Sequence, residues 1–254
     1  MILNELKSSE VKQKIENDVV LILPMGSTEQ HGPHLPIKVD IFIPHQLALR
    51  AAKETGSLVA PPIYYGYNEK ELMFPGTASV SITSFQNYVF EVCRSFYKTG
   101  FRKLLLLNGH RGNRFILHSV VNLLAEHTDV QCAGLDYYDL VKDIVSEVRE
   151  SSVGGMQHAC EFETSVMLYL DEHSVDMSRA KAEFSPYLGS KYTDHDMTFD
   201  PIVFMTAPFE KRTKSGVLGD PTLATKDKGE AIFEGAVQRL IEFITYFRNL
   251  KSLD

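Results

Sequence analysis

Two continuous apolar runs, each followed at once by glycines and polar residues, constrain the fold of this chain more than any other feature. The first run occupies residues 19–23 (VVLIL) and ends at Pro24 and Gly26. The second lies in residues 103–107 (KLLLL), is apolar from Leu104 onward, and ends at an Asn-Gly-His segment. A short apolar run bounded by turn residues is typical of a strand buried on both faces of a parallel sheet. Such a sheet needs helices on both sides.

Helical and strand patterns alternate through the first two thirds of the chain. Apolar residues at helical spacing, with cap and stop signals, predict helices, and shorter apolar stretches predict strands. The helices are expected at residues 44–53, 83–99, 113–127, 138–149, 158–170 and 224–249, and further strands at 58–63 and 130–137. The pattern predicts a three-layer α/β/α fold with a largely parallel central sheet, in one domain spanning residues 1–254. Residues 171–222 lose periodicity and are interpreted as a long excursion outside the core.

Charge and composition narrow the class of partner. The chain has 254 residues, 26 basic and 33 acidic, with a formal net charge of -7 and no basic run. This balance argues against nucleic acid or an anionic membrane as partner and favours a small-molecule substrate. The sequence contains no apolar window of roughly 18 residues that could span a membrane, and its N-terminus has no apolar leader core. With three cysteines, an odd number, we expect a cytoplasmic protein without a disulfide framework.

Potential metal ligands follow both apolar runs. Glu29, His31 and Asp40 follow the first run, and His110 follows the second. In open parallel sheets the functional crevice lies beyond the carboxyl ends of the strands, so both groups should face it. Glu29 and His31 are two residues apart in extended backbone and can point to one side, and Asp40 can fold back after a Gly-Pro turn. Carboxylates with imidazoles suit Zn, Mn or Fe(II), and one aspartate can bridge two ions.

Taken one at a time, each of these carboxylates and histidines is more often a solvated loop residue than a metal ligand. Their combination with glycines directly after two buried strands favours a metal site, but the residues alone leave both interpretations open. His34, in the same segment, is interpreted as a loop histidine.

A third polar cluster occupies residues 158–165, where a helix is expected. On a helix, His158 and Glu161 are three positions apart and share a face. Glu163 is five positions from His158 and would point elsewhere, so this geometry favours Glu161 if a carboxylate joins His158 at a site. The alternative is a helix N-terminus at which both glutamates merely complement the helix dipole.

Several of these segments together resemble the signature of the creatininase family, the creatinine amidohydrolases and their relatives. The resemblance covers nearly the whole chain, and its motifs occur in the family's order. The matching segments are Gly26 to Pro36 (GSTEQHGPHLP) followed by Asp40, then Phe74 to Thr77 (FPGT), Asn108 to Asn113 (NGHRGN), His158 to Ser165 (HACEFETS) and Gly216 to Pro221 (GVLGDP).

The resemblance implies a creatininase-like fold and two divalent metal ions per chain, Zn, Mn or Fe. By position, the ligands would be Glu29, Asp40 and His110 for one ion, and His31, Asp40 and one more carboxylate for the other. Creatininases take that carboxylate from the position that is Gly112 here, which has no side chain. We therefore assign the role to Glu161, with Glu163 as the fallback.

The site also departs from creatininase at the substrate lid. Creatininases close a tryptophan over the substrate, four residues before the histidine that matches His158. The corresponding residue is Gly154, and the chain has no tryptophan. We therefore do not expect creatinine to be the substrate.

The function predicted from these features is a binuclear amidohydrolase that cleaves a cyclic amide or a formamide-type C–N bond through a metal-bridging hydroxide. His158 would act as general acid, the Gly109 backbone would leave room for substrate, and Arg111 would bind an anionic group unless it is a surface arginine. Family relatives imply a homo-oligomer. The alternatives are a ring-opening hydrolase of an inosose-type carbocyclic ketone and a non-catalytic metal-binding member of the family.

Overall fold

The computed structural model of the chain describes residues 1–203, 205 and 208–251. Its main sheet contains four parallel strands in the order β2-β1-β3-β4. These strands are β1 (Val20–Met25), β2 (Leu58–Val59), β3 (Lys103–Asn108) and β4 (Gln131–Asp136). Val20 pairs with Lys103, and Lys103 pairs with Gln131, so the three longer strands start in register. Both predicted apolar runs are therefore confirmed as the central strands.

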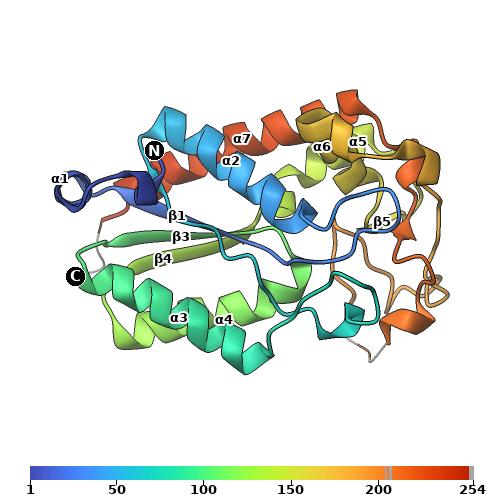
Figure 1. Cartoon of the computed structure of the whole chain (residues 1–254), viewed down its shortest axis with the longest axis horizontal. Coiled ribbons are helices and arrows are strands. Elements are labelled where there is room, and N and C mark those ends of the chain that lie inside the picture. Colours follow the sequence, from blue (N-terminus) through green and yellow to red (C-terminus); the bar gives the residue numbers. More distant parts are fainter. Residues whose placement is uncertain (204, 206–207, 252–254) are drawn as a thin grey trace.

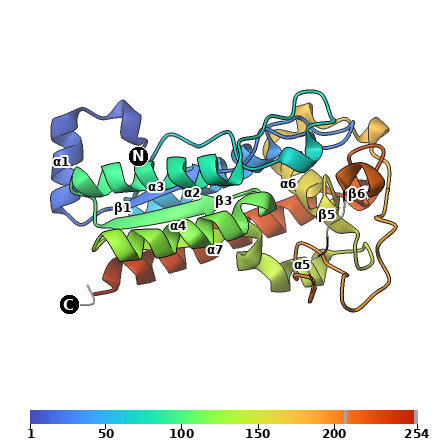
Figure 2. The same ribbon diagram turned by 90° about the horizontal axis from the view of Figure 1, so that it is seen from below.

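Helices cover both faces of this sheet (Figures 1 and 2). On one face α2 and α6 pack against the long C-terminal helix α7, and on the other α3 packs against α4. The helices are α1 (Ser8–Glu16), α2 (Val39–Thr55), α3 (Ile82–Lys98), α4 (Arg114–His127), α5 (Lys142–Val148), α6 (Glu161–Asp171) and α7 (Lys226–Asn249). The predicted three-layer α/β/α architecture is confirmed.

Two hydrophobic cores result from the alternation of side chains along the strands. Val20 and Ile22 of β1 face the core beneath α2 and α7, whereas Leu21 and Leu23 face the core beneath α3 and α4. Successive side chains of a strand point to opposite faces, so a strand between two helical layers must be apolar at every position. This requirement explains why β1 and β3 show no polar alternation.

Three predicted helix boundaries were wrong near the site. The helix expected from residue 44 begins at Val39 as α2, so Asp40 lies in its first turn. The helix expected from residue 138 begins with a 3-10 segment, Tyr137–Val141, before α5. The helix expected from residue 158 begins only at Glu161, because His158 ends strand β5 (Met156–His158) and Ala159 has a positive φ of 49°. A left-handed residue cannot belong to a regular α-helix.

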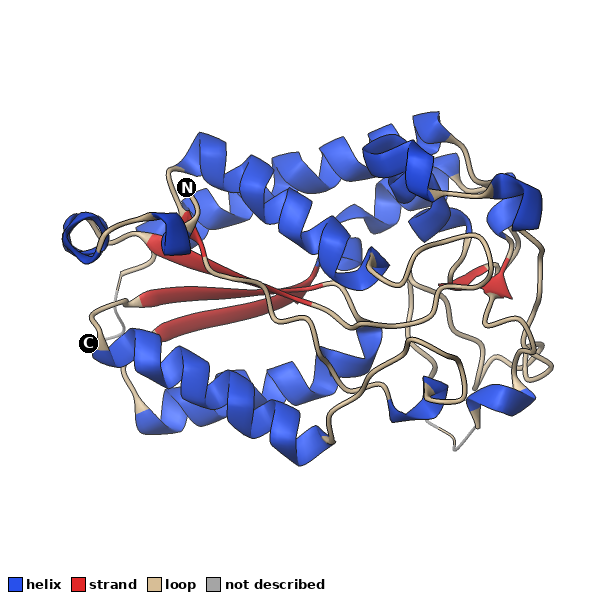
Figure 3. Cartoon of the chain, in the orientation of Figure 1, coloured by secondary structure: helices blue, strands red, loops and turns tan. Residues whose placement is uncertain are grey.

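The segment 171–222 contributes to the interior more than predicted. Within it, β6 (Leu218–Gly219) pairs antiparallel with β5, and Met197, Phe209 and Val217 are buried. This segment covers the edge of the sheet at which the parallel strands end, where most loops of the chain also lie (Figure 3). The part of the chain that the structure describes contains no helix long and apolar enough to cross a membrane.

Candidate metal centre

A cavity of about 460 Å³ opens beyond the carboxyl ends of β1 and β3. Glu29, Asp40 and His110 line its floor together with His158 and Glu163. His31 lies beneath them and is fully buried. The structure therefore brings together four of the five residues predicted as ligands, together with the fallback Glu163, at the place where an open α/β sheet binds its ligand.

Asp40 is placed between two groups of potential ligands. Its Oδ2 lies 2.9 Å from His110 Nδ1, which is also 2.8 Å from Glu29 Oε2. Its Oδ1 lies 3.2 Å from His31 Nε2, which is 3.8 Å from Glu163 Oε1. Each carboxylate oxygen of Asp40 thus faces a different histidine nitrogen, which is the arrangement that a carboxylate shared between two cations requires.

The outer nitrogens of both histidines are held by backbone carbonyls. His110 Nε2 lies 3.0 Å from the carbonyl oxygen of Tyr67, and His31 Nδ1 lies 3.1 Å from that of Glu29. A carbonyl can only accept, so these nitrogens carry the protons in the neutral rings. His110 Nδ1 and His31 Nε2 are then left with lone pairs directed at the carboxylates, as in metal-ligating histidines whose other nitrogen is fixed by an outer partner.

The electrostatics of this floor fit a cation. Burial, followed by the charge of Glu71, raises the pKa of Glu29 well above its usual value. Burial also opposes protonation of His31 and His110, but neighbouring carboxylates, among them Asp40, outweigh it and raise the pKa of both rings well above normal. Both oxygens of Glu29, His31 Nε2 and Asp40 Oδ2 are buried without a hydrogen-bond partner. Because buried polar atoms are nearly always satisfied, this donor set fits divalent metal ions.

Two glycines allow the backbone to bring Asp40 to this position. A Cβ added to Gly26 or Gly109 would lie 2.2 Å or 2.1 Å from the carbonyl oxygen of Asp40. The first turn of α2 can therefore rest directly on the ends of β1 and β3. Pro44 lies four residues after Asp40 within α2 and has no N–H to bond that carbonyl. An acidic side chain in the first turn is also favoured by the helix dipole.

The structure corrects the expectation for Glu161. Its carboxylate is buried away from the cavity, 2.6 Å from Lys228 Nζ and within 3.0 Å and 2.9 Å of the backbone nitrogens of Glu150 and Ser151. It is therefore neither beside His158 nor placed to act as a ligand or catalytic group. The prediction assumed a helix through His158 and Glu161, but the break at Ala159 removes their common face.

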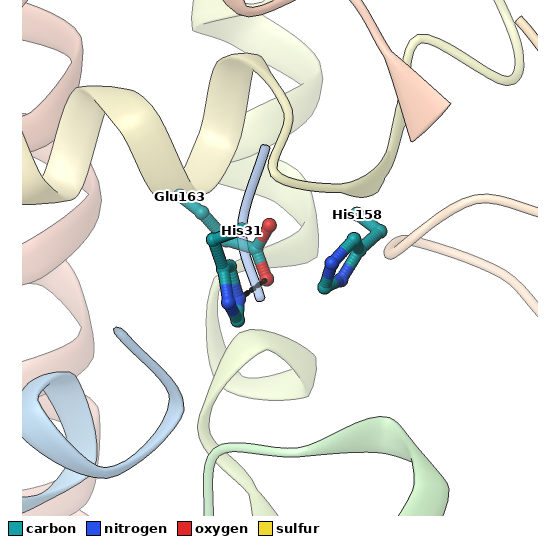
Figure 4. A group of neighbouring side chains, drawn as sticks. All are labelled: His31, His158 and Glu163. Carbon is teal, nitrogen blue, oxygen red and sulfur yellow. Dashed lines mark ion pairs between the residues drawn. The ribbon is translucent and has the colours of Figure 1, made fainter. Parts of the chain in front are cut away.

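Glu163 occupies the place expected for the missing carboxylate. It lies in the first turn of α6, and its side chain points toward His31, with His158 on the other side (Figure 4). His31, His158 and Glu163 can bring one ligand atom each within 4.8 Å of one another. Burial raises its pKa, but His31 and then His158 outweigh this effect, so the pKa of Glu163 is lowered. Its position fits the fallback assignment.

His158 borders both groups. Its Nε2 lies 2.8 Å from the carbonyl oxygen of Gln30, and its Nδ1 lies 3.4 Å from Glu29 Oε1. Its ring lies 4.4 Å from that of His31 and is in edge contact with Phe209 at 5.8 Å, both measured between ring centres. With Nε2–H donating to the carbonyl, the Nδ1 lone pair faces the cavity floor and can accept a proton.

Gly109 and Arg111, which were predicted to bind substrate, contact other parts of the protein, and so does Gly112. Gly109 borders the cavity, but a side chain at this position would collide with the backbone of Asp40. The absence of a side chain therefore makes room for Asp40 and not for substrate. A Cβ at Gly112 would lie 2.3 Å from His110 Nε2, so the hydrogen bond of that ring to Tyr67 requires a glycine. Arg111 forms an ion pair with Asp200 and donates to two backbone carbonyls, so its charge is already compensated. His34 is a buried loop histidine that contacts Thr164.

Several residues at the cavity were not singled out from the sequence. Gln30 Nε2 donates to Glu71 Oε2 at 3.0 Å, and Phe209, His195 and Arg212 come from the segment that was interpreted as an excursion. Gln30 lies within the first motif, but it was not singled out there as a site residue. Glu71 lies three residues before the Phe74 to Thr77 segment and Arg212 four residues before the Gly216 to Pro221 segment, but neither segment supplied a predicted site residue.

The comparison with known proteins agrees with this geometry. A family model described as "Creatininase: Creatinine amidohydrolase" matches residues 4–244. The chain belongs to the creatininase family. The predictions of the family and of a hydrolase acting on C–N bonds other than peptide bonds are thereby confirmed at the level of the family.

Relatives with different names are about equally similar to the chain. It is 30% identical to a creatinine amidohydrolase of Pseudomonas putida, over 94% of each chain. It is 31% identical to a 3-dehydro-scyllo-inosose hydrolase of Thermotoga maritima, over 92% of this chain and 78% of that protein. It is also 31% identical to a mycofactocin precursor peptide peptidase of Mycobacterium tuberculosis, over 93% and 88%. Identity therefore does not select one substrate.

A solved structure described as "Creatininase Mn" superposes with a TM-score of 0.84 at 30% identity, covering 98% of this chain and 99% of that one. Together with the buried ligand groups of this chain, this likeness supports the binding of divalent metal. The number of ions, the cytoplasmic location and the treatment of residues 1–254 as one domain stay predictions.

Proposed function

We propose that this chain is a binuclear metal-dependent amidohydrolase that cleaves the C–N bond of a cyclic amide or formamide other than creatinine. The observation that supports it most is the position of Asp40, whose two oxygens face two separate buried histidine nitrogens. One ion would be held by Glu29, Asp40 and His110, and the other by His31, Asp40 and Glu163. Two such ions would lower the pKa of a water and polarise the substrate carbonyl.

The protein's own groups supply the proton transfers. His158 Nδ1, unprotonated while Nε2–H donates to the carbonyl of Gln30, can accept the proton of the attacking water. The resulting imidazolium can deliver that proton to the leaving nitrogen. Glu71, 3.6 Å from His158 Nε2, would stabilise the positive charge. The aromatic ring of Phe209 packs against His158 and keeps water from one side of it.

The aromatic lid that the family resemblance predicts for creatinine is missing at its expected position. Gly154, at the family's lid position, has a φ of 84°, and a Cβ there would lie 2.4 Å from Leu188. Position 154 thus faces a neighbouring side chain and does not border the cavity. Gly154 itself therefore supplies no ring that could stack on a flat substrate at the metal centre.

A second candidate is ring opening of an inosose-type ketone, which the likeness to the Thermotoga maritima hydrolase favours. The same floor would activate water, but His158 would then protonate a carbon leaving group. Cleavage of a peptide precursor, the activity in the name of the mycobacterial relative, is the third reaction to include in a screen.

The test combines a substrate screen with metal counting. The purified protein, loaded with Mn or Zn, is assayed on cyclic amides, formamides, inosose-type ketones and short peptides. His158→Gln should retain two ions per chain by elemental analysis and lose turnover by about 10²-fold or more. His173→Gln, a change of an exposed histidine, is the matched control and should alter neither. Loss of an ion in His158→Gln would make His158 a ligand, and absence of turnover on every amide would reject the proposal.

A further inference from the structure

Arg212 places an unpaired positive charge in the wall of the cavity. Its Nη2 is 2.8 Å from Gln157 Oε1 and 3.0 Å from His195 Nε2. His195 Nδ1 is bonded to the carbonyl of Thr193, and burial, the largest effect, lowers the pKa of His195. Both partners of the guanidinium are therefore neutral acceptors. Within the described residues, Arg212 forms no ion pair.

The remaining donors of Arg212 are open to the cavity. Nη2 uses its two protons on Gln157 and His195, and Nη1 and Nε have no partner among the described residues. Neither nitrogen is one of the buried polar atoms that lack a hydrogen-bond partner, so both nitrogens are accessible to solvent. Burial lowers the pKa of Arg212, and the charge of Glu71 offsets this only in part. A guanidinium in this state gains from an incoming anion, which it can bind through two N–H groups.

The loop around Arg212 is held firmly. Glu183 accepts hydrogen bonds from the hydroxyl of Thr213 at 2.8 Å and from the backbone nitrogens of Lys214 and Ser215 at 2.7 Å and 3.0 Å. The backbone nitrogen of Arg212 donates to the carbonyl of Phe209 at 2.8 Å. The guanidinium is therefore positioned before any ligand arrives, which limits the entropy lost on binding.

The other basic groups near the cavity are less suited to this role. Arg111 is paired with Asp200, as described above, and Arg114 is paired with Asp136, Asp139 and Asp200. Lys70 also borders the cavity, but it is exposed to solvent. Among the described residues, Arg212 is the partly buried arginine of this wall that forms no ion pair with a carboxylate.

We propose that Arg212 binds an oxyanion of the substrate, a carboxylate or a phosphate, and that the amide cleaved by this enzyme therefore carries such a group. The inference rests on the proposed function for the cleaved bond. The ring centre of Phe209 lies 5.8 Å from that of His158 and 5.9 Å from the guanidinium carbon of Arg212, so one aromatic ring contacts both groups. The amide would lie at the His158 end and the anion at the Arg212 end.

The experiment compares matched ligands that differ only in the anionic group. Binding of succinamate, 3-phosphonopropionamide and the neutral succinamide to the metal-loaded full chain is measured by calorimetry. In the wild-type protein, at least one anionic ligand should bind about tenfold or more tightly than succinamide, because charge-assisted hydrogen bonds are the strong ones. The preferred anion identifies carboxylate or phosphate as the natural group.

Variants then assign the preference to Arg212. Arg212→Gln should abolish the preference, so that the anionic ligand binds no more tightly than succinamide, and Arg212→Lys should retain part of the preference. Arg94→Gln, at a partly exposed arginine of α3 that does not border the cavity, removes the same charge and should keep the full preference.

The outcomes separate this inference from the proposed function. A wild-type protein without preference for either anion, or an Arg212→Gln variant that keeps the preference, overturns the role of Arg212 even if neutral amides are hydrolysed. A preference that depends on Arg212 supports the inference even if the reaction proves to be ring opening of a ketone, because the measurement is one of binding.

Discussion

Glu161 and Glu163 lie two residues apart on α6, and we predict that their Glu→Gln substitutions have opposite consequences. Glu161→Gln should destabilise the fold and leave the metal content unchanged. Glu163→Gln should remove one of two ions and leave the fold stable. The reason is that Glu161 faces Lys228 and two backbone N–H groups, whereas Glu163 faces His31.

The magnitude for Glu161 follows from its burial. Its carboxylate is only 1% exposed and forms an ion pair with Lys228 at 2.6 Å. Removing one partner of a buried pair costs about 3–5 kcal/mol. We expect a value near 3 kcal/mol, because Lys228 keeps a second partner, Glu150, at 2.8 Å. That is a large part of a typical stability of about 5–15 kcal/mol. An amide NH₂ facing a backbone N–H adds to the loss.

The pH dependence has a definite sign. Burial disfavours ionisation of Glu161, but Lys228 and the hydrogen bonds at residues 150 and 151 outweigh it, so its pKa lies below the ordinary value of 4.5. A carboxyl whose pKa is lowered by folding stabilises the native state above its unfolded pKa. This contribution is lost as the pH falls through the lower, folded value. The wild-type protein should therefore lose stability in acid more steeply than Glu161→Gln.

For Glu163→Gln the loss should be in metal affinity. Removing an outer partner of a ligand already costs about 10–100-fold in affinity, so removing a ligand should cost more than about 100-fold for one ion. Metal content is measured by elemental analysis after dialysis, and stability by urea unfolding at saturating metal. Glu172→Gln, an exposed glutamate just after α6, is the matched control and should change neither. Two tightly bound ions in Glu163→Gln, or a lost ion at unchanged stability in Glu161→Gln, would refute the reasoning.

Three further predictions concern the whole site and the whole protein. Asp40→Ala should reduce the metal content to zero or one ion per chain and lower the activity more than removal of any other ligand. Elemental analysis and an activity assay measure these effects. Two bound ions with normal turnover would contradict a carboxylate shared between the ions. Creatinine should be hydrolysed with a kcat/KM below about 10⁴ M⁻¹s⁻¹, the low end for ordinary enzymes, and a steady-state assay with a higher value would restore creatinine as a substrate. The protein should be a homo-oligomer, and light scattering that shows only a 28.7 kDa species at micromolar concentration would exclude this.

The sequence by itself determined the sheet and most of the metal centre, because both depend on local pattern. A short apolar run without alternation, bounded by turn residues, is typical of a strand buried on both faces, and β1 and β3 have such runs. Residues directly after such strands must lie at the same edge of the sheet. Glu29, His31, Asp40 and His110 were therefore predictable together from their place after the strands.

The tertiary structure decided between Glu161 and Glu163, and the reason is a single backbone angle. The helical spacing of residues 158–170 continues through Ala159, but the left-handed backbone there ends the strand and lets α6 begin at Glu161. Which carboxylate faces the cavity depends on this break and on Lys228. That lysine lies 67 residues after Glu161 and forms an ion pair with its carboxylate. A periodicity argument assumes one continuous element and cannot detect the break.

Arg212 shows the same limit for long-range contacts. Its segment has no periodicity and no chemical motif, so nothing local distinguishes it from Arg111, which lies inside the Asn-Gly-His motif. The charge available to a ligand is the one left uncompensated after folding. Folding pairs Arg111 with Asp200 and places Arg212 beside a neutral amide and a neutral imidazole. An arginine charge is neutralised by a carboxylate far away in the sequence only once the chain has folded. Only the tertiary structure could therefore show which arginine remains available to a ligand.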